Sequence, residues 1–275
     1  MTIEETPVDP LWWLAYLALG SFVGLMAGLL GIGGGGIMVP ILTSLFVIQG
    51  VPHEHIAHLA LGTAMAAIVP SASASLWSHH RHGAVRWHIV RHITPAILAG
   101  TFLATFIAAL MPTRGLAIFF AAFMVLMSLQ MLVNLKPKPT RTLPGPVGLS
   151  GAGLGIGGIS ALVAIGGGSL TVPFLTWCNV RLPQAIGTSA AVGLPIALAG
   201  ALGYVINGWD TAGLPDAAWG YVYLPALLLM APFSILTAPL GARLAHRLPV
   251  ALLRRVFAVM LMILALQMLY TVFTA

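Results

Sequence analysis

Eight apolar stretches, each long enough to cross a lipid bilayer as a helix, dominate this chain of 275 residues. A membrane-spanning helix needs roughly 20 apolar residues. Charged residues make up 7% of the chain, far below the roughly 25% of soluble domains. The stretches cover residues 11–32, 56–78, 93–111, 116–135, 147–165, 185–206, 221–242 and 251–273. The sequence therefore predicts an all-α integral membrane protein, folded as a polytopic helical bundle.

A glycine-rich block that ends in proline occurs twice, at residues 33–40 (GGGGIMVP) and 166–173 (GGGSLTVP). Each block leads into an apolar stretch that is too short to span comfortably, residues 37–49 and 170–178. Irregular backbone at membrane depth is tolerated only where it is buried in protein or lines a cavity. We therefore expect 8–10 membrane segments, two of them broken, glycine-rich half-helices that lie beside a substrate site.

The two blocks belong to a longer internal repeat. Aligning Gly33 with Gly166 brings further matching motifs into the same order, which favours a duplication over chance. The matches are Val39 with Val172, Pro40 with Pro173, Ala60–Ala64 with Ala185–Ser189, Pro70 with Pro195, Pro112 with Pro249, and Leu129–Leu132 with Leu266–Leu269. The join between the copies is polar and rich in proline. It divides the chain into a first transmembrane repeat (1–135), a cytoplasmic linker (136–146) and a second transmembrane repeat (147–275).

The positive residues of equivalent loops predict that the two repeats have opposite orientations. Lys and Arg near helix ends mark the cytoplasmic side. One loop of the first repeat carries Arg81, Arg86 and Arg91, whereas its counterpart, residues 207–215, has Asp210 and no positive residue. The next loop reverses this bias, with only Arg114 in the first repeat against Arg243, Arg247, Arg254 and Arg255 in the second. An inverted pair of repeats needs an odd number of membrane crossings in each half. The number is five if the short glycine-block segment crosses the membrane, which we favour, and three if that segment is re-entrant.

The glycine blocks are also the candidate substrate site. A helix start offers unpaired amides and a positive dipole end, both of which attract anions. We expect Ser169 to be the N-cap of the second half-helix and Pro173 to lie in its first turn. The candidate residues are Gly34, Gly35, Gly36, Gly167, Gly168 and Ser169 in the blocks, with the hydroxyls of Thr63, Thr188 and Ser189 and the serines Ser71, Ser73 and Ser75 nearby.

Other glycines and the histidines have plainer interpretations. Gly20, Gly24 and Gly28, and Gly151 with Gly155, have the spacing of helix-packing faces. Histidine clusters at 53–58 and 79–92 could bind a metal but are more typical of wet membrane interfaces, so no metal site is assigned. The glycine runs lack the preceding strand and the later acidic residue of a dinucleotide-binding fingerprint. No G-K-[ST] sequence follows them, so no Walker-type nucleotide site is visible either. No constellation of nucleophile, base and acid is visible, so we expect neither an enzyme nor a cofactor.

Taken with the Gly-Thr steps and the loop Arg81–Trp87 (RHGAVRW), the two glycine-proline blocks make the chain resemble the sulfite exporter TauE/SafE family of membrane permeases, from about Leu17 to Leu269. The resemblance implies a carrier in the bacterial inner membrane for a small sulfur-containing anion, such as sulfite, an organosulfonate or sulfoacetate. The expected partners are this solute and the lipid bilayer, with no nucleic acid, and a homo-oligomer is left open.

Two rival functions remain at this stage. A cation or metal permease would suit the histidines, but no Asp, Glu, Lys or Arg lies at the centre of any predicted span. A non-transporting membrane assembly scaffold is the other alternative. The sequence gives neither the direction of transport nor the coupling ion.

Overall fold

The chain folds into an all-α bundle, and the computed structural model describes residues 10–30, 34–133, 141–245 and 249–274. The helices of these ranges are α1 (Pro10–Leu30), α2 (Gly35–Ile48), α3 (Ile56–Arg81), α4 (Trp87–Leu110), α5 (Thr113–Val133), α6 (Pro146–Val163), α7 (Gly168–Trp177), α8 (Leu182–Gly208), α9 (Leu224–Ala245) and α10 (Val250–Thr274). A short hairpin, β1 (Ala218–Trp219) and β2 (Val222–Tyr223), precedes α9. Eight of these helices are long and apolar enough to cross a membrane, which confirms the polytopic fold.

The helices α2 and α7 are half-helices. They contain 14 and 10 residues, or about 21 and 15 Å at 1.5 Å per residue, whereas the hydrocarbon core is about 30 Å thick. Each half-helix runs back toward the end of the bundle at which the preceding long helix begins, α2 toward the start of α1 and α7 toward the start of α6. The hydroxyl of Tyr16 near the start of α1 donates to Gln49 Oε1 after α2, at 2.9 Å. Likewise the amide of Arg141, just before α6, donates to the carbonyl of Trp177 at the end of α7, at 3.2 Å. Neither short helix is long enough to cross on its own. The helix lengths therefore fit three crossings per half, rather than the five favoured from the sequence.

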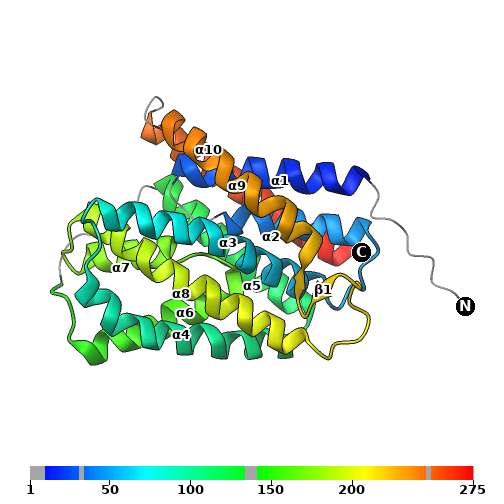
Figure 1. Cartoon of the computed structure of the whole chain (residues 1–275), viewed down its shortest axis with the longest axis horizontal. Coiled ribbons are helices and arrows are strands. Elements are labelled where there is room, and N and C mark those ends of the chain that lie inside the picture. The colour runs from blue at the N-terminus through cyan, green and yellow to red at the C-terminus, as the bar shows by residue number, and fades with distance from the viewer. Residues whose placement is uncertain (1–9, 31–33, 134–140, 246–248, 275) are drawn as a thin grey trace, which may run out of the picture.

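The two predicted repeats are interleaved rather than side by side. Helix α1 packs along α9, α4 packs along α6, and α3, α8, α5 and α10 complete the bundle (Figure 1). Shifting each helix number by five turns the α1–α9 pair into the α6–α4 pair. The same shift exchanges α3 with α8, and these two helices also pack together.

Glycines allow these close helix pairs. A Cβ on Gly20 would lie 2.5 Å from the carbonyl oxygen of Met230, and one on Gly24 would lie 2.6 Å from Ser234 Cα. The predicted packing role of Gly20 and Gly24 is therefore confirmed. The expectation for Gly151 and Gly155 is wrong, because a Cβ at either would meet nothing within 4 Å. Instead the α4 face of α6 presents the glycines Gly153 and Gly157.

The two ends of the bundle carry opposite charge. At one end the α3–α4 loop touches the first turn of α8, since both Nε and Nη2 of Arg86 donate to Gln184 Oε1, at 2.9 and 2.7 Å. This basic end, on the left of Figure 1, also carries Arg81, Arg91, Arg141, Arg181, Arg243 and Arg255 among the described residues. The opposite end carries Glu54, Asp210 and Asp216, with Arg114. We call these the basic end and the acidic end.

Candidate functional site

The two glycine blocks, 133 residues apart in the sequence, meet inside the bundle. A Cβ on Gly35, at the start of α2, would collide with the carbonyl oxygen of Ala164, which closes α6 in a left-handed conformation (φ 47°). Ile68 of α3 borders both blocks. Its side chain would lie 3.1 Å from a Cβ on Gly35 and 3.3 Å from a Cβ on Gly166. The structure therefore brings the starts of α2 and α7 close together.

The start of α7 differs from the sequence prediction in detail. Its N-cap is Gly167, with φ of 45°, and Ser169 lies inside the first turn with no capping role. Pro173 is the sixth helical residue, one turn later than expected. A positive φ is costly for a residue with a Cβ, so glycine at 167 allows the chain to enter α7 at this sharp angle. Pro40 occupies the same sixth position in α2.

The backbone around Gly167 leaves two donors available. The amides of Gly167 and Gly168 donate to the carbonyls of Ile165 and Gly166, and the amide of Thr171 donates to Gly167 at 2.8 Å. Within the described residues, the amides of Ser169 and Leu170 have no backbone partner. Such amides at the positive end of a helix dipole attract negative charge.

Helix α8 forms the wall opposite Gly167. A Cβ on Gly167 would lie 3.3 Å from the carbonyl oxygen of Ser189 and 3.4 Å from Gly193 Cα. Ser189 is 3% exposed. Its hydroxyl has no hydrogen-bond partner within the part of the chain that is described. Among the hydroxyl residues predicted from the sequence, Ser189 is thus one whose backbone borders a glycine block.

A second hydroxyl at this place was missed by the sequence analysis. Thr171, in the first turn of α7, is 0% exposed, and its Oγ1 also has no partner among the described residues. The signal was present in the sequence, because Thr171 lies inside the second glycine-proline block, where the first block has Met38.

Thr63 and Thr188, both predicted to contact the substrate, accept hydrogen bonds from backbone amides in this structure. Thr63 Oγ1 accepts the amide of Tyr223 just before α9, at 2.9 Å, and Thr188 Oγ1 accepts the amide of Arg86 just before α4, at 3.0 Å. The preceding glycines allow the approach, since a Cβ on Gly62 or Gly187 would collide with the chain before α9 or α4. Each Gly-Thr step therefore docks the start of a helix of the other predicted repeat. We call the two contacts the Thr63 dock, at the acidic end, and the Thr188 dock, at the basic end.

The serines after Pro70 serve their own helix. The hydroxyl of Ser71 donates to the carbonyl of Ile68, and that of Ser73 donates to Val69, both at 2.9 Å. Their donors are used within α3, so the structure gives no reason to place them at the glycine blocks.

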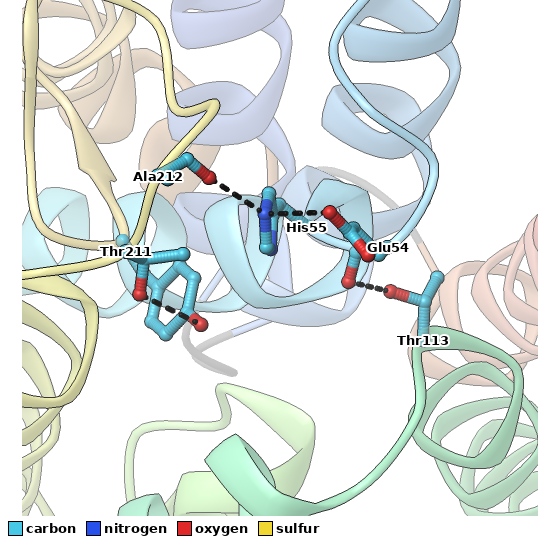
Figure 2. Close-up of polar contacts among 6 residues, drawn as sticks. Glu54, His55, Thr113, Thr211 and Ala212 are labelled. Carbon is cyan, nitrogen blue, oxygen red and sulfur yellow. Dashed lines mark hydrogen bonds and ion pairs between the residues drawn. The ribbon is translucent and has the colours of Figure 1, made fainter.

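The histidines of the acidic end hold loops together (Figure 2). His55 Nε2 lies 3.1 Å from the carbonyl oxygen of Ala212 and 3.3 Å from Glu54 Oε1, which requires a proton on that nitrogen. Thr113 donates to the carbonyl of Glu54 at 2.6 Å. His58 stacks on Tyr221 with ring centroids 5.0 Å apart. Among the described residues, no group of three or more His, Cys, Asp or Glu side chains could hold a metal ion.

The eight long apolar helices and the two half-helices inside the bundle define a polytopic membrane protein. The chain belongs to the sulfite exporter TauE/SafE family, whose model matches residues 16–268. A probable membrane transporter protein of Haemophilus influenzae is 35% identical over 256 residues, which cover 93% of this chain and 97% of that relative. The probable membrane transporter protein YunE of Bacillus subtilis is 22% identical, over 92% of this chain and 96% of its own. No solved structure matches this chain.

As a member of this family, the chain is a multi-pass membrane transporter, whose partners are a solute and the lipid bilayer around it. The family and the relatives are described as transporters, and the relatives' names specify no solute.

Proposed function

We propose that this chain is a secondary transporter of a small sulfur-containing oxyanion, such as sulfite or an organosulfonate, across the bacterial inner membrane. The observation that carries the proposal is the meeting of the α2 and α7 starts, with Ile68 in contact with both. Each half-helix presents its positive dipole end and backbone amides to this place. Transporters built from inverted repeats bind anionic groups at such discontinuous helices.

The packing pattern supports the inverted repeat that this mechanism needs. The exchange of α1–α9 for α6–α4 is what two copies related by a two-fold axis would produce. The basic end gathers the α3–α4 loop, the end of α9 and the start of α10, which come from different repeats. By the positive-inside rule this end faces the cytoplasm.

The two docks suggest how access alternates. The Thr63 dock lies toward the acidic end and the Thr188 dock toward the basic end, and both hydrogen bonds are formed in this structure. Each ties a Gly-Thr step of one repeat to a helix start of the other. Opening one dock while the other stays formed would expose the glycine blocks to one side of the membrane at a time.

Flux measurements with a matched pair of glycine variants test the proposal. A Cβ on Gly193 would lie 3.9 Å from the Gly166 backbone without a clash, so Gly193→Ala adds a methyl group beside the block while the fold is kept. Gly155→Ala is the control, because nothing lies within 4 Å of that position. In proteoliposomes we expect the wild type and Gly155→Ala to exchange sulfite or ethanesulfonate, and Gly193→Ala to lose most of this flux. Normal flux through Gly193→Ala would remove the glycine blocks from the mechanism.

A further inference from the structure

The Thr63 dock and the Thr188 dock match in their backbone contacts. In each, the threonine accepts a backbone amide, and a Cβ on the preceding glycine would meet the carbonyl of the residue two positions before that amide. This residue is Tyr221 in the Thr63 dock and Ala84 in the Thr188 dock. At one equivalent position, therefore, the acidic end has a phenol ring and the basic end has a methyl group.

His58 packs on the phenol ring of Tyr221. The two rings stack with their centroids 5.0 Å apart. The alignment of the Gly-Thr motifs places Pro183 where the first repeat has His58, so neither ring has a counterpart in the Thr188 dock. Among the described residues, His58 is also the one histidine or charged residue with a buried side chain, at 3% exposed. Ionisable groups buried in a membrane protein usually mark a pathway for protons or ions.

One ring nitrogen of His58 is hydrogen-bonded in this structure and the other is not. Nε2 lies 3.0 Å from the carbonyl oxygen of Ala108 near the end of α4, so this nitrogen carries a proton and donates it. Nδ1 is buried and has no partner in the part of the chain that is described. The carbonyl of Glu54, one turn earlier, already accepts the Thr113 hydroxyl at 2.6 Å. A second proton, on Nδ1, would create a buried charge and an unpaired donor, and both are costly.

The elements around His58 offer such a charge little compensation. In α4 no titratable residue follows His92, and α2 and α6 contain none. The carboxylate of Glu54 is 77% exposed and pairs with His55 (Figure 2), which repels a charged His58 when it is itself protonated. The other titratable groups on the elements and loops of this end are Tyr16, His53, Arg114, Tyr204, Asp210, Asp216, Tyr221 and Tyr223. Of these, Tyr204 donates to the carbonyl of Ala161, and Arg114 lies over the Phe273 ring.

Opening of the acidic end would remove the cost of the second proton. Once Tyr221 moves away from His58, water can reach Nδ1 and solvate the charge. The open form therefore binds this proton more tightly than the closed form does. By linkage, a ligand that binds one form more tightly shifts the protein toward that form. Acidification should thus favour opening of this end.

We propose that His58 is a proton-binding site that controls the acidic end of the transporter. A proton from the outside binds Nδ1, separates the start of α3 from Tyr221 and opens the Thr63 dock, while the Thr188 dock stays formed. This inference rests on the proposed function and supplies the ion that drives one half of its access cycle.

The first test measures ethanesulfonate flux in proteoliposomes with the same pH on both sides. A sulfonate stays ionised when the pH is lowered from about 8 to about 5, across the ordinary pKa of histidine. Wild-type flux should rise about fivefold or more, the lower end of typical coupling between two sites. Flux through His58→Gln should not respond, because glutamine keeps a donor for Ala108 but cannot take up a proton. His82→Gln is the matched control, since this exposed histidine bonds to its own helix, and it should keep the full response.

A second readout measures opening without transport. Ala67 lies one turn deeper than Thr63 on the same face of α3 and is 1% exposed. In a Cys178→Ser background, Ala67→Cys in right-side-out vesicles is labelled with a membrane-impermeant maleimide. As the pH falls, its labelling rate should rise relative to the same protein with His58→Gln, and relative to an exposed cysteine in Asp210→Cys. Ratios are used because acid lowers the thiolate fraction of every cysteine.

The possible failures are distinguishable. Absence of wild-type flux for sulfite and ethanesulfonate at every pH would refute the proposed function, while the labelling ratios would still test the proton site. Equal pH responses of flux and labelling in the wild type and His58→Gln would overturn the proton site and leave anion transport standing. A response lost in His55→Gln but kept in His58→Gln would assign the proton to His55, which also overturns the inference. If His58→Gln failed to fold, an unchanged ratio of Ala67→Cys to Asp210→Cys labelling would still contradict it.

Discussion

The two docks predict unequal losses of stability when their threonines are replaced by valine. Valine matches the shape of threonine but cannot accept a hydrogen bond, so the partner amide loses its acceptor. Thr63 is 0% exposed and its partner Tyr223 is 8% exposed. No water can replace the lost acceptor there, and Thr63→Val should cost about 1–3 kcal/mol, the penalty for an unsatisfied buried donor.

The Thr188 dock should be less sensitive. Its partner Arg86 lies on the exposed loop between α3 and α4, so water can reach the amide once Thr188 Oγ1 is gone. We expect Thr188→Val to cost about 0.5–1 kcal/mol, the net value of one hydrogen bond. Thr63→Ser and Thr188→Ser, which keep the hydroxyl, should recover most of each loss.

Unfolding in detergent, followed by circular dichroism, measures these differences, with Thr43→Val as the control for a buried threonine that bonds to its own helix. The reasoning would be refuted if Thr63→Val were no more destabilising than Thr188→Val, or if Thr63→Ser were as unstable as Thr63→Val. A normal melting temperature with a raised KM in Thr63→Val would instead return Thr63 to the substrate site.

Three further predictions use other parts of the molecule. Gly24→Ala should destabilise the protein by about 1–3 kcal/mol, because its Cβ would overlap α9, whereas Gly151→Ala should be neutral or stabilising; equal melting temperatures would contradict this. Burial raises the pKa of the Cys178 thiol, and the positive charge of Arg141 opposes this rise. Maleimide at neutral pH should therefore label Cys178 more slowly in the folded protein than in the unfolded protein. Labelling should be slower still in Arg141→Ala, which lacks the opposing charge. Labelling at equal rates would disprove the raised pKa. In a Cys178→Ser background, His82→Cys should react only from the cytoplasm and Asp210→Cys only from outside; reaction of both from one side would end the inverted topology.

Hydropathy was sufficient to find the long helices, because apolar length is what the bilayer selects. The stretch 56–78 became α3, Ile56–Arg81, and 93–111 became α4, which starts earlier at Trp87. The difference arises because α4 continues into a polar interface segment that hydropathy does not score. The half-helices were also predicted, since glycine runs and prolines act locally on the backbone.

Tertiary contacts explain what the sequence could not predict. Ser169 looked like an N-cap, but the cap is Gly167, which has a positive φ, three residues after α6 ends at Ala164. The Gly-Thr steps were predicted as substrate groups. The sequence could not show that Thr63 and Thr188 bond to the amides of Tyr223 and Arg86, because these partners lie 160 and 102 residues away in the chain. Thr171 was visible in the sequence, but only the structure shows that its hydroxyl makes no bond within the described chain.

The central claim, that the facing half-helix starts bind a small anion, is tested most directly by isothermal titration of the purified protein. Ethanesulfonate and sulfite should bind with Kd values on the order of micromolar to millimolar, about 8 to 4 kcal/mol, because the described site offers dipoles and hydroxyls without a buried lysine or arginine. A divalent cation titrated under the same conditions should give no heat of binding. Tight binding of the cation, with no response to either anion, would contradict the account and favour a cation permease.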